Sequence, residues 1–169
     1  MTKQTYFSSE HVSPGHPDKV MDAIAESVVD YQVDRGAART AVDGCCKNNM
    51  VVLVGECSDY ENIPFQDLAT SVVRYIGYTP KNSPSFNSEN MELISVFTGQ
   101  SADIAAGTND VAKGAGDIGI MFGGAVKEAP DFTCHSHYLA REISHKIYML
   151  TFKNPQICPD QKNTGNCEV

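Results

Sequence analysis

A proline that precedes a run of regularly spaced apolar residues constrains the fold of this chain more than any other feature. Pro17 stands within the stretch Gly15-His16-Pro17-Asp18-Lys19. Proline is tolerated at the first position of a helix, where its missing N–H is no loss. The residues that recur behind it at helical spacing are Val20, Ile24, Val28 and Tyr31. The pattern predicts a helix that begins at Pro17 and ends near 32–35, before Gly36.

This helix start would place His16 and Asp18 at the positive end of the helix dipole. Unpaired backbone N–H groups at such an end favour anions. A histidine can donate a hydrogen bond to a phosphate oxygen, and a neighbouring carboxylate can hold the magnesium that phosphates carry. The five residues alone favour an ordinary capped helix, and the anion site stays open as the alternative at this point.

Length and composition describe a globular protein with room for one ordinary domain or two small ones. The chain has 169 residues, of which 41% are hydrophobic, and it contains no apolar run of the roughly 20 residues that a membrane span needs. The first residues, MTKQTYFSSEHVS, lack the apolar segment of a signal peptide. The net charge of −8 argues against a nucleic-acid partner, which requires clustered Lys and Arg.

The six cysteines form no C-x-x-C pair, so without a secretion signal we expect reduced thiols and a cytoplasmic location. Cys134-His135-Ser136-His137 resembles half of a metal cluster. It has no second ligand pair at zinc-finger spacing, which favours ordinary residues at the start of a helix over a structural zinc site.

Two consecutive runs predict a β-hairpin. Residues 39–46 and the β-branched run 50–57 have strand character, and Lys47-Asn48-Asn49 between them suits a tight turn. Asp43 and Glu56 would then be carboxylates within apolar strands. Buried carboxylates are costly unless they meet a cation or hydrogen-bond donors, so the pair indicates a site unless each lies at an exposed position.

Further along the chain the pattern predicts a helix from Pro64 to Gly77 and a strand over 91–98. Residues 99–110 are small and polar, which is typical of a functional lid or of a disordered segment. A third helix is expected over about 136–150, and the tail 153–169 is expected to be a loop. The apolar residues predicted to face the core from the third helix are Leu139, Ile143, Ile147 and Leu150.

The stretch Gly114-Ala115-Gly116-Asp117-Ile118-Gly119 fits the dinucleotide-binding pattern G-x-G-x-x-G. That fingerprint requires a strand before it and a helix after it. A polar loop precedes it here, and residues 118–122 have strand character. We therefore interpret these glycines as positions where the backbone runs close to a ligand or another chain.

Taken together, the segments resemble the S-adenosylmethionine synthetase (methionine adenosyltransferase) family over about residues 6–162. Residues 8–19 are similar to the family's opening S-E-S-V-S-x-G-H-P-D-K, and GAGDIGIMFG at 114–123 is similar to GAGDQGLMFG. The stretches MVVLVGE, RYIGY and GQSADI match in order between them, and Pro159-Asp160-Gln161-Lys162 resembles P-D-x-K. Cys158 replaces the Arg that usually stands shortly before that last motif.

The resemblance implies roles for individual residues. His16 and Lys162 would be catalytic residues that contact the triphosphate, and Asp18 would bind Mg²⁺. ATP contacts would also come from Asp117 and Asp160. The residues implied to contact methionine are Glu56, Gln100 and Asp117. Asp43 falls where the family places a K⁺-binding Glu, and residues 100–110 would gate the site.

The resemblance also implies an α+β fold of β-α-β-β-α-β units, incomplete relative to the full family fold. We expect residues 1–12 and 125–169 to pack as one part and 13–124 as another. Family members run well beyond twice this length, and the later signature G-G-G-A-F-S-G-K-D is not in this sequence. With ATP and methionine as substrates and with Mg²⁺ and K⁺ as cofactors, the activity would need several further cations around the phosphates.

Three interpretations follow. The chain is one subunit of a split synthetase, completed by a complementary chain or by homo-oligomerisation. Alternatively it is a non-catalytic homologue that binds and regulates a full-length synthetase, or it is a fragment or the product of a degraded gene. The retained ligand-contacting residue types favour the first, although a fold analogy alone does not establish function.

Overall fold

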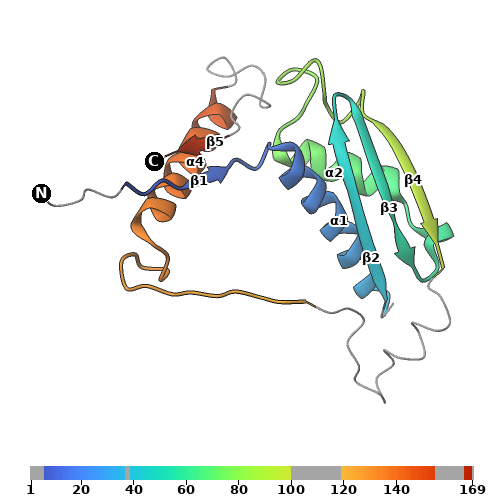
Figure 1. Ribbon diagram of the computed structural model, residues 1–169. Helices are drawn as coiled ribbons and strands as arrows, with labels where there is room; N and C mark the ends of the chain where they lie inside the picture. Colours follow the sequence, from blue (N-terminus) through green and yellow to red (C-terminus); the bar gives the residue numbers. More distant parts are fainter. Residues whose placement is uncertain (1–5, 37–38, 100–118, 155–165, 169) are drawn as a thin grey trace, which may run out of the picture.

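The computed structural model describes residues 6–36, 39–99, 119–154 and 166–168, which form a mixed α+β fold (Figure 1). The elements in chain order are β1 (Glu10–Val12), α1 (Pro17–Val33), β2 (Thr40–Lys47), β3 (Met50–Cys57), the 3-10 turn η1 (Tyr60–Asn62), α2 (Phe65–Ile76), β4 (Glu92–Thr98), α4 (His135–Lys153) and β5 (Asn166–Glu168). The order from β1 to β4 is the expected β-α-β-β-α-β series. No described helix is both long and apolar enough to cross a membrane.

Helix α1 begins and ends where its sequence predicts. His16 is the N-cap residue and Pro17 is the first helical residue. Val20, Ile24 and Val28 are at most 1% exposed and form the face that packs into the core. The chain leaves the helix after Asp34, and Gly36 adopts a positive φ of 73°, a conformation that glycine reaches at little cost.

The predicted hairpin supplies two strands of a three-stranded sheet of order β2-β3-β4, in which β3 is central. Strands β2 and β3 are antiparallel, with Lys47 paired to Met50 across the turn, and Asn48 has a left-handed φ of 56°. Asparagine tolerates this region, which explains the tight connection. Strand β4 runs parallel to β3, because helix α2 carries the chain back before β4 begins.

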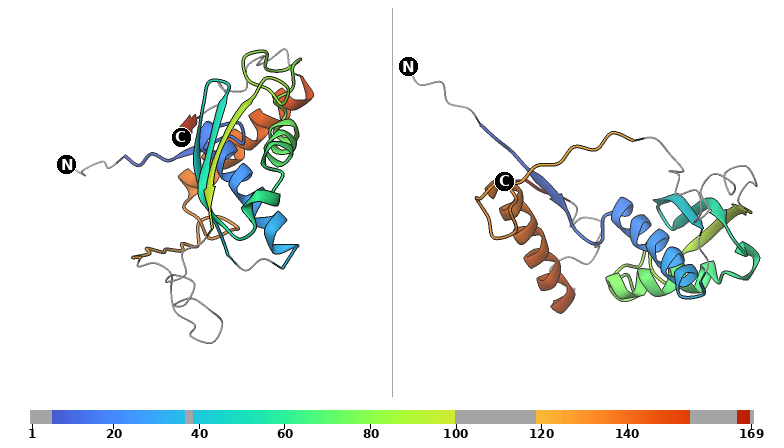
Figure 2. Two further views of the ribbon diagram at one scale, coloured as in Figure 1. Left: turned by 90° about the vertical axis from the view of Figure 1, so that its right-hand side faces the viewer. Right: turned by 90° about the horizontal axis from the view of Figure 1, so that it is seen from below.

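Both α1 and α2 cover the same face of this sheet, and none of the described helices lies on the opposite face (Figure 2). The core therefore lies between the helices and the inward side chains of β3 and β4, including Val51, Leu53 and Phe97. We call the opposite side the outer face; its apolar side chains include Val54, Ile94 and Val96, which are 41%, 46% and 59% exposed.

The two terminal strands and α4 lie beside each other, away from the three-stranded sheet (Figure 1). Strand β1 pairs antiparallel with β5, with His11 opposite Cys167. The prediction that the whole tail is a loop is therefore wrong at 166–168, where backbone pairing forms a strand that has no side-chain periodicity to reveal it. A hydrogen bond of 2.8 Å from the Tyr148 hydroxyl to the Ile76 carbonyl joins α4 to the end of α2.

Two further expectations are wrong in the described residues. Leu139, Ile143, Ile147 and Leu150 of α4 are 40–54% exposed, and the buried side chains of this helix are those of Ala140, Ser144 and Thr151. The helix thus turns its smaller residues towards the rest of the described chain. Residues 119–122 pair with no described strand, and the Phe122 side chain is 96% exposed.

Candidate functional site

The N-terminus of α1 places His16 and Asp18 side by side, as the sequence predicts. The Nδ1 atom of His16 accepts a hydrogen bond from the Asp18 backbone nitrogen at 3.3 Å. It also lies 3.8 Å from the Asp18 carboxylate, but the closer N–H contact identifies Nδ1 as an acceptor. In the neutral ring the proton is then on Nε2, which leaves that nitrogen as the donor available to an anion.

The Asp18 side chain is 90% exposed and stands in the first turn of the helix. The backbone N–H groups of that turn and the helix dipole stabilise negative charge there. An exposed carboxylate of this kind suits Mg²⁺, which keeps several waters and is held by one or two carboxylates plus substrate phosphates. No group of three or more His, Cys, Asp or Glu side chains suited to a metal occurs in the described part of the chain.

Lys19 turns away from this end of the helix. Its Nζ atom donates to the Val12 carbonyl at 3.0 Å and lies 3.3 Å from Nε2 of His11. Burial lowers the pKa of His11, and electrostatic interaction with Lys19, His137 and Arg141 lowers it further, so its Nε2 is suited to accept from the Lys19 ammonium. Lys19 therefore links β1 to α1. The sequence contained no signal for its contact with His11.

A second pair of candidate residues lies on the outer face of the sheet. Asp43 is opposite Val54 and Glu56 is opposite Ala41 in the β2–β3 ladder, so the two carboxylates are diagonal neighbours on one face. Both line an open hollow of about 520 Å³. Asp43 is exposed, and its Oδ1 atom accepts from the Gly44 backbone nitrogen at 2.7 Å. Glu56 is half-buried.

The structure thus brings the candidate residues together in two pairs rather than in one cluster. Helix α1 packs on the inner face of the sheet, whereas the alternation of β2 and β3 directs Asp43 and Glu56 to the outer face. The His16–Asp18 pair lies near the hairpin end of β2, where a cavity is lined by Pro17, Cys46 and Lys47. Within one copy of the described chain, the two pairs do not face each other.

The other candidates of the sequence lie outside the described residues. These are Gln100, Asp117, Asp160 and Lys162, together with Cys158 and the gating loop over 100–110. Cys134 to His137 are described and stand at the start of α4, as expected. Cys134 is the N-cap residue, and His137 meets the ring of His11 edge-to-face with centroids 5.6 Å apart.

A hydrogen bond from the hydroxyl of Ser136 lowers the pKa of the Cys134 thiol, with a further contribution from the His137 backbone N–H. The Cys134 Sγ and Ser136 Oγ atoms are 3.5 Å apart.

Tyr78 is a site residue that the sequence did not reveal. Its buried hydroxyl donates a hydrogen bond to the carbonyl of Gly15, the residue just before His16. In the sequence, Tyr78 was marked by its place directly after Gly77, which ends α2, and as the last residue of the matched stretch RYIGY.

Comparison with known proteins identifies relatives of this chain. Residues 4–102 match the profile of the S-adenosylmethionine synthetase N-terminal domain. The S-adenosylmethionine synthase of Fusobacterium nucleatum is 40% identical over 166 residues, which cover 96% of this chain and 42% of that protein. The enzyme of the same name from Salinibacter ruber is 37% identical over 169 residues, covering 96% of this chain and 43% of that protein.

A solved structure described as an unusual S-adenosylmethionine synthetase from Campylobacter jejuni superimposes with a TM-score of 0.72 at 29% identity. The match covers 88% of this chain and 38% of that one. The chain thus spans somewhat less than half of the relatives it matches and corresponds to their N-terminal part. The profile match extends over more than half of the sequence, and on this evidence the chain belongs to the S-adenosylmethionine synthetase family.

Proposed function

We propose that this chain is a subunit of a split methionine adenosyltransferase, active only in complex with a complementary synthetase chain. The reaction is attack of the methionine sulfur on C5′ of ATP, which forms the S–C5′ bond of S-adenosylmethionine as the C5′–O bond to triphosphate breaks. The triphosphate is then hydrolysed to phosphate and diphosphate. The observation that supports the proposal is that the described candidate residues form two separate pairs, which do not face each other within one copy of the described chain.

In this proposal His16 donates from Nε2 to the triphosphate, and Lys162 is the second catalytic contact with it. The other proposed ATP contacts are Asp117 and Asp160. Asp18 would hold Mg²⁺, which when bound neutralises charge on the phosphates. The 90% exposure of the Asp18 carboxylate and the acceptor role of His16 Nδ1 support these two assignments.

Glu56, on the outer face, is proposed to contact the methionine amino group. Gln100 and Asp117 are the other proposed methionine contacts. A carboxylate suits an ammonium group, and the half-buried position of Glu56 strengthens such a pair relative to a fully exposed one. Asp43, its diagonal neighbour, is the proposed K⁺ ligand. Its bond to the Gly44 nitrogen uses one lone pair of Oδ1 and leaves the second oxygen for a cation.

The requirement for a partner follows from the charges. Triphosphate departure calls for neutralisation of about four negative charges by metal ions and fixed cations. Residues 1–169 carry a net charge of −8, and the motif cations among them are Lys19 and Lys162, with His16 as a hydrogen-bond donor. Lys19 is already engaged by the Val12 carbonyl and His11. We therefore propose that the complementary chain supplies the remaining cations.

The test is S-adenosylmethionine production from ATP, methionine and Mg²⁺ by this chain alone, by the complementary half of a family member alone, and by the two mixed. We expect synthesis only in the mixture. Robust synthesis by this chain alone would contradict the need for a partner. If no tested mixture is active, the chain is not a catalytic subunit with that complement.

A regulatory role is the second candidate, because the outer face offers apolar side chains to a protein partner. Val54, Ile94 and Val96 are exposed there beside one another in the register of β3 and β4. A regulator would bind a full-length synthetase and change its rate without adding a site. Co-purification from the source distinguishes the two, since a half-length partner with the late family motifs supports the split enzyme. The thiols of Cys45, Cys46, Cys57 and Cys134 are free, in keeping with the proposed cytoplasmic location.

A further inference from the structure

We propose that Tyr78 is a positioning residue, whose buried hydroxyl holds the turn that carries His16 and Asp18 in place at the phosphate end of α1. The Tyr78 hydroxyl donates to the Gly15 carbonyl at 2.5 Å across 63 residues of sequence. Gly15 is buried and directly precedes His16. The inference rests on the proposed function, and it assigns to that site a residue that makes no contact with substrate.

Tyr78 is well suited to act as a fixed anchor. Its backbone nitrogen donates to the Val73 carbonyl at 3.1 Å, next to Gly77, whose positive φ of 108° ends α2. Its ring meets Phe86 edge-to-face with centroids 5.1 Å apart, and the side chain is 1% exposed. Neither its backbone nor its ring can move without disturbing the core, so the position of the hydroxyl is set by α2.

The turn itself is shaped by bonds within its own segment. The His16 backbone nitrogen donates to the Ser13 carbonyl at 3.0 Å, and Lys19 donates to the Val12 carbonyl at 3.0 Å. These bonds define how residues 12–19 fold on one another, and they would move with the segment as a unit. The bond from Tyr78 differs, because its donor belongs to the end of another helix and so relates the turn to the rest of the fold.

Packing alone does not hold the turn on this side. A cavity of about 130 Å³ lies against Gly15 and Pro17, and Val20, Cys46, Tyr78 and Phe86 are among its other walls. If the hydroxyl were removed, the Gly15 carbonyl would lose this donor and the backbone would have space into which it could shift. His16 follows Gly15 directly, so a shift there changes the position of the donor that faces the triphosphate.

The first experiment measures kinetics of Tyr78→Phe in the active mixture with the complementary half. Phenylalanine keeps the ring against Phe86 and removes only the donor. Tyr75→Phe is the matched control, because it makes the same chemical change three residues earlier at a side chain that is 85% exposed. We expect kcat to fall about 10- to 100-fold in Tyr78→Phe, as for an active-site group displaced by about 1 Å, with KM for methionine and the Tyr75→Phe constants unchanged.

A purely structural role would give a different result. Tyr78→Phe would then lower the thermal unfolding midpoint and leave kcat and KM of the folded protein at their wild-type values, measured well below that midpoint. That outcome would overturn the inference. Equal losses in Tyr78→Phe and Tyr75→Phe would also overturn it, because the effect would not come from the bond to Gly15.

The second experiment needs no activity and separates this inference from the proposed function. Histidine-labelled chain is studied by NMR, and His16→Gln identifies the imidazole signal of His16. We expect that signal to shift in Tyr78→Phe and to stay at its wild-type position in Tyr75→Phe. An unmoved signal in Tyr78→Phe refutes positioning, whether or not the mixture makes S-adenosylmethionine. An inactive wild-type mixture with a shifted signal refutes only the split-enzyme proposal.

Discussion

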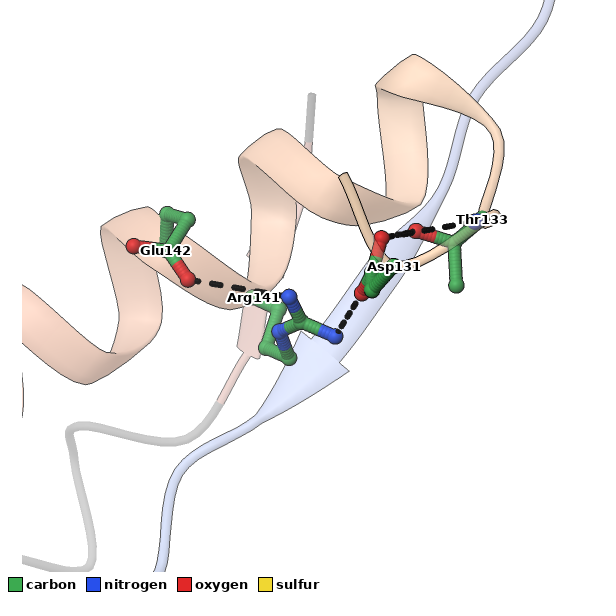
Figure 3. A network of polar contacts seen from close by, with 4 residues as sticks. All are labelled: Asp131, Thr133, Arg141 and Glu142. Atoms are coloured by element: carbon green, nitrogen blue, oxygen red, sulfur yellow. Dashed lines mark hydrogen bonds and ion pairs between the residues drawn. The ribbon is translucent and has the colours of Figure 1, made fainter. Parts of the chain in front are cut away.

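Asp131 and Arg141 form an ion pair in which the Nη1 atom of the arginine lies 2.5 Å from the carboxylate (Figure 3). The ion pair links the segment before α4 to the second turn of that helix. The hydroxyl of Thr133 donates to the other carboxylate oxygen at 2.8 Å. Together the Thr133 hydroxyl and the Arg141 guanidinium lower the pKa of Asp131 from 3.8 to about 2.

This pKa predicts how stability depends on acid pH. Because the folded-state pKa is below the unfolded value, the contribution of Asp131 is present above pH 3.8 and is lost as pH falls towards about 2. We expect Asp131→Asn to unfold at lower temperature than wild type at pH 7, with the difference shrinking between pH 4 and pH 2. Asp22→Asn makes the same change at an exposed carboxylate of α1 and should show no such convergence. A pH-independent difference for Asp131→Asn would contradict the assignment.

The His16 donor predicts a specific loss of catalysis. In the mixture with the complementary half, His16→Ala should reduce S-adenosylmethionine formation about 100- to 1,000-fold, the usual effect of removing one preorganised donor to developing charge. Assembly of the two chains should persist, because the side chain is only a local cap. His135→Ala, at the exposed start of α4, is the control. Steady-state assays with gel filtration of each mixture check both statements, and wild-type turnover in His16→Ala would exclude the assigned role.

The outer face predicts association through the sheet. Val96 is 59% exposed on that face, on the edge strand β4, opposite Val54 of β3. We expect the chain to be oligomeric or hetero-complexed, and Val96→Lys to weaken association at least about ten-fold, because an apolar contact is replaced by a charge that must be desolvated. Val33→Lys places the same charge on the 62%-exposed end of α1 and should not weaken it. Light scattering that finds wild type monomeric at micromolar concentration would contradict this prediction.

The core between α1 and the sheet predicts a large cost for one truncation. Ile24 is 0% exposed in the core cluster, whereas Val33 at the end of the same helix is 62% exposed. Ile24→Ala should lower the free energy of unfolding by about 2–5 kcal/mol, because it leaves a cavity that the sheet cannot close. Val33→Ala should change it by less than about 0.5 kcal/mol. Urea unfolding of both variants measures the difference, and equal costs would show that the helix packs differently.

Local sequence determined the secondary structure wherever a backbone rule was strong. Pro17 began α1, Gly77 ended α2, and Asn48 made the hairpin turn, each through a conformational preference that acts within a few residues. The motif around His16 likewise predicted the pairing of that side chain with Asp18, because N-cap geometry is local. These features depend on local conformational preferences and not on tertiary packing.

Tertiary structure decided the features that depend on distant partners. The spacing of apolar residues predicted that Leu139 would face the core from α4. In the described chain Ala140, Ser144 and Thr151 are buried instead, and Leu139 is exposed. Residue spacing identifies the apolar face of a helix, but it does not determine which element packs against that face. Strand β5 forms only through backbone pairing with β1. Its three residues carry no sequence pattern that predicts the pairing of Cys167 with His11, which lies 156 positions earlier.

The same distinction applies to the candidate site. The sequence determined that Asp43 and Glu56 lie on paired strands, because strong strand propensity and a tight turn leave one register. Only the fold decided that they face away from α1, that Lys19 binds β1 rather than an anion, and that Tyr78 reaches Gly15. Those relationships depend on the face of the sheet that the helices cover. The burial of apolar surface over the whole core determines this face, and no single motif does.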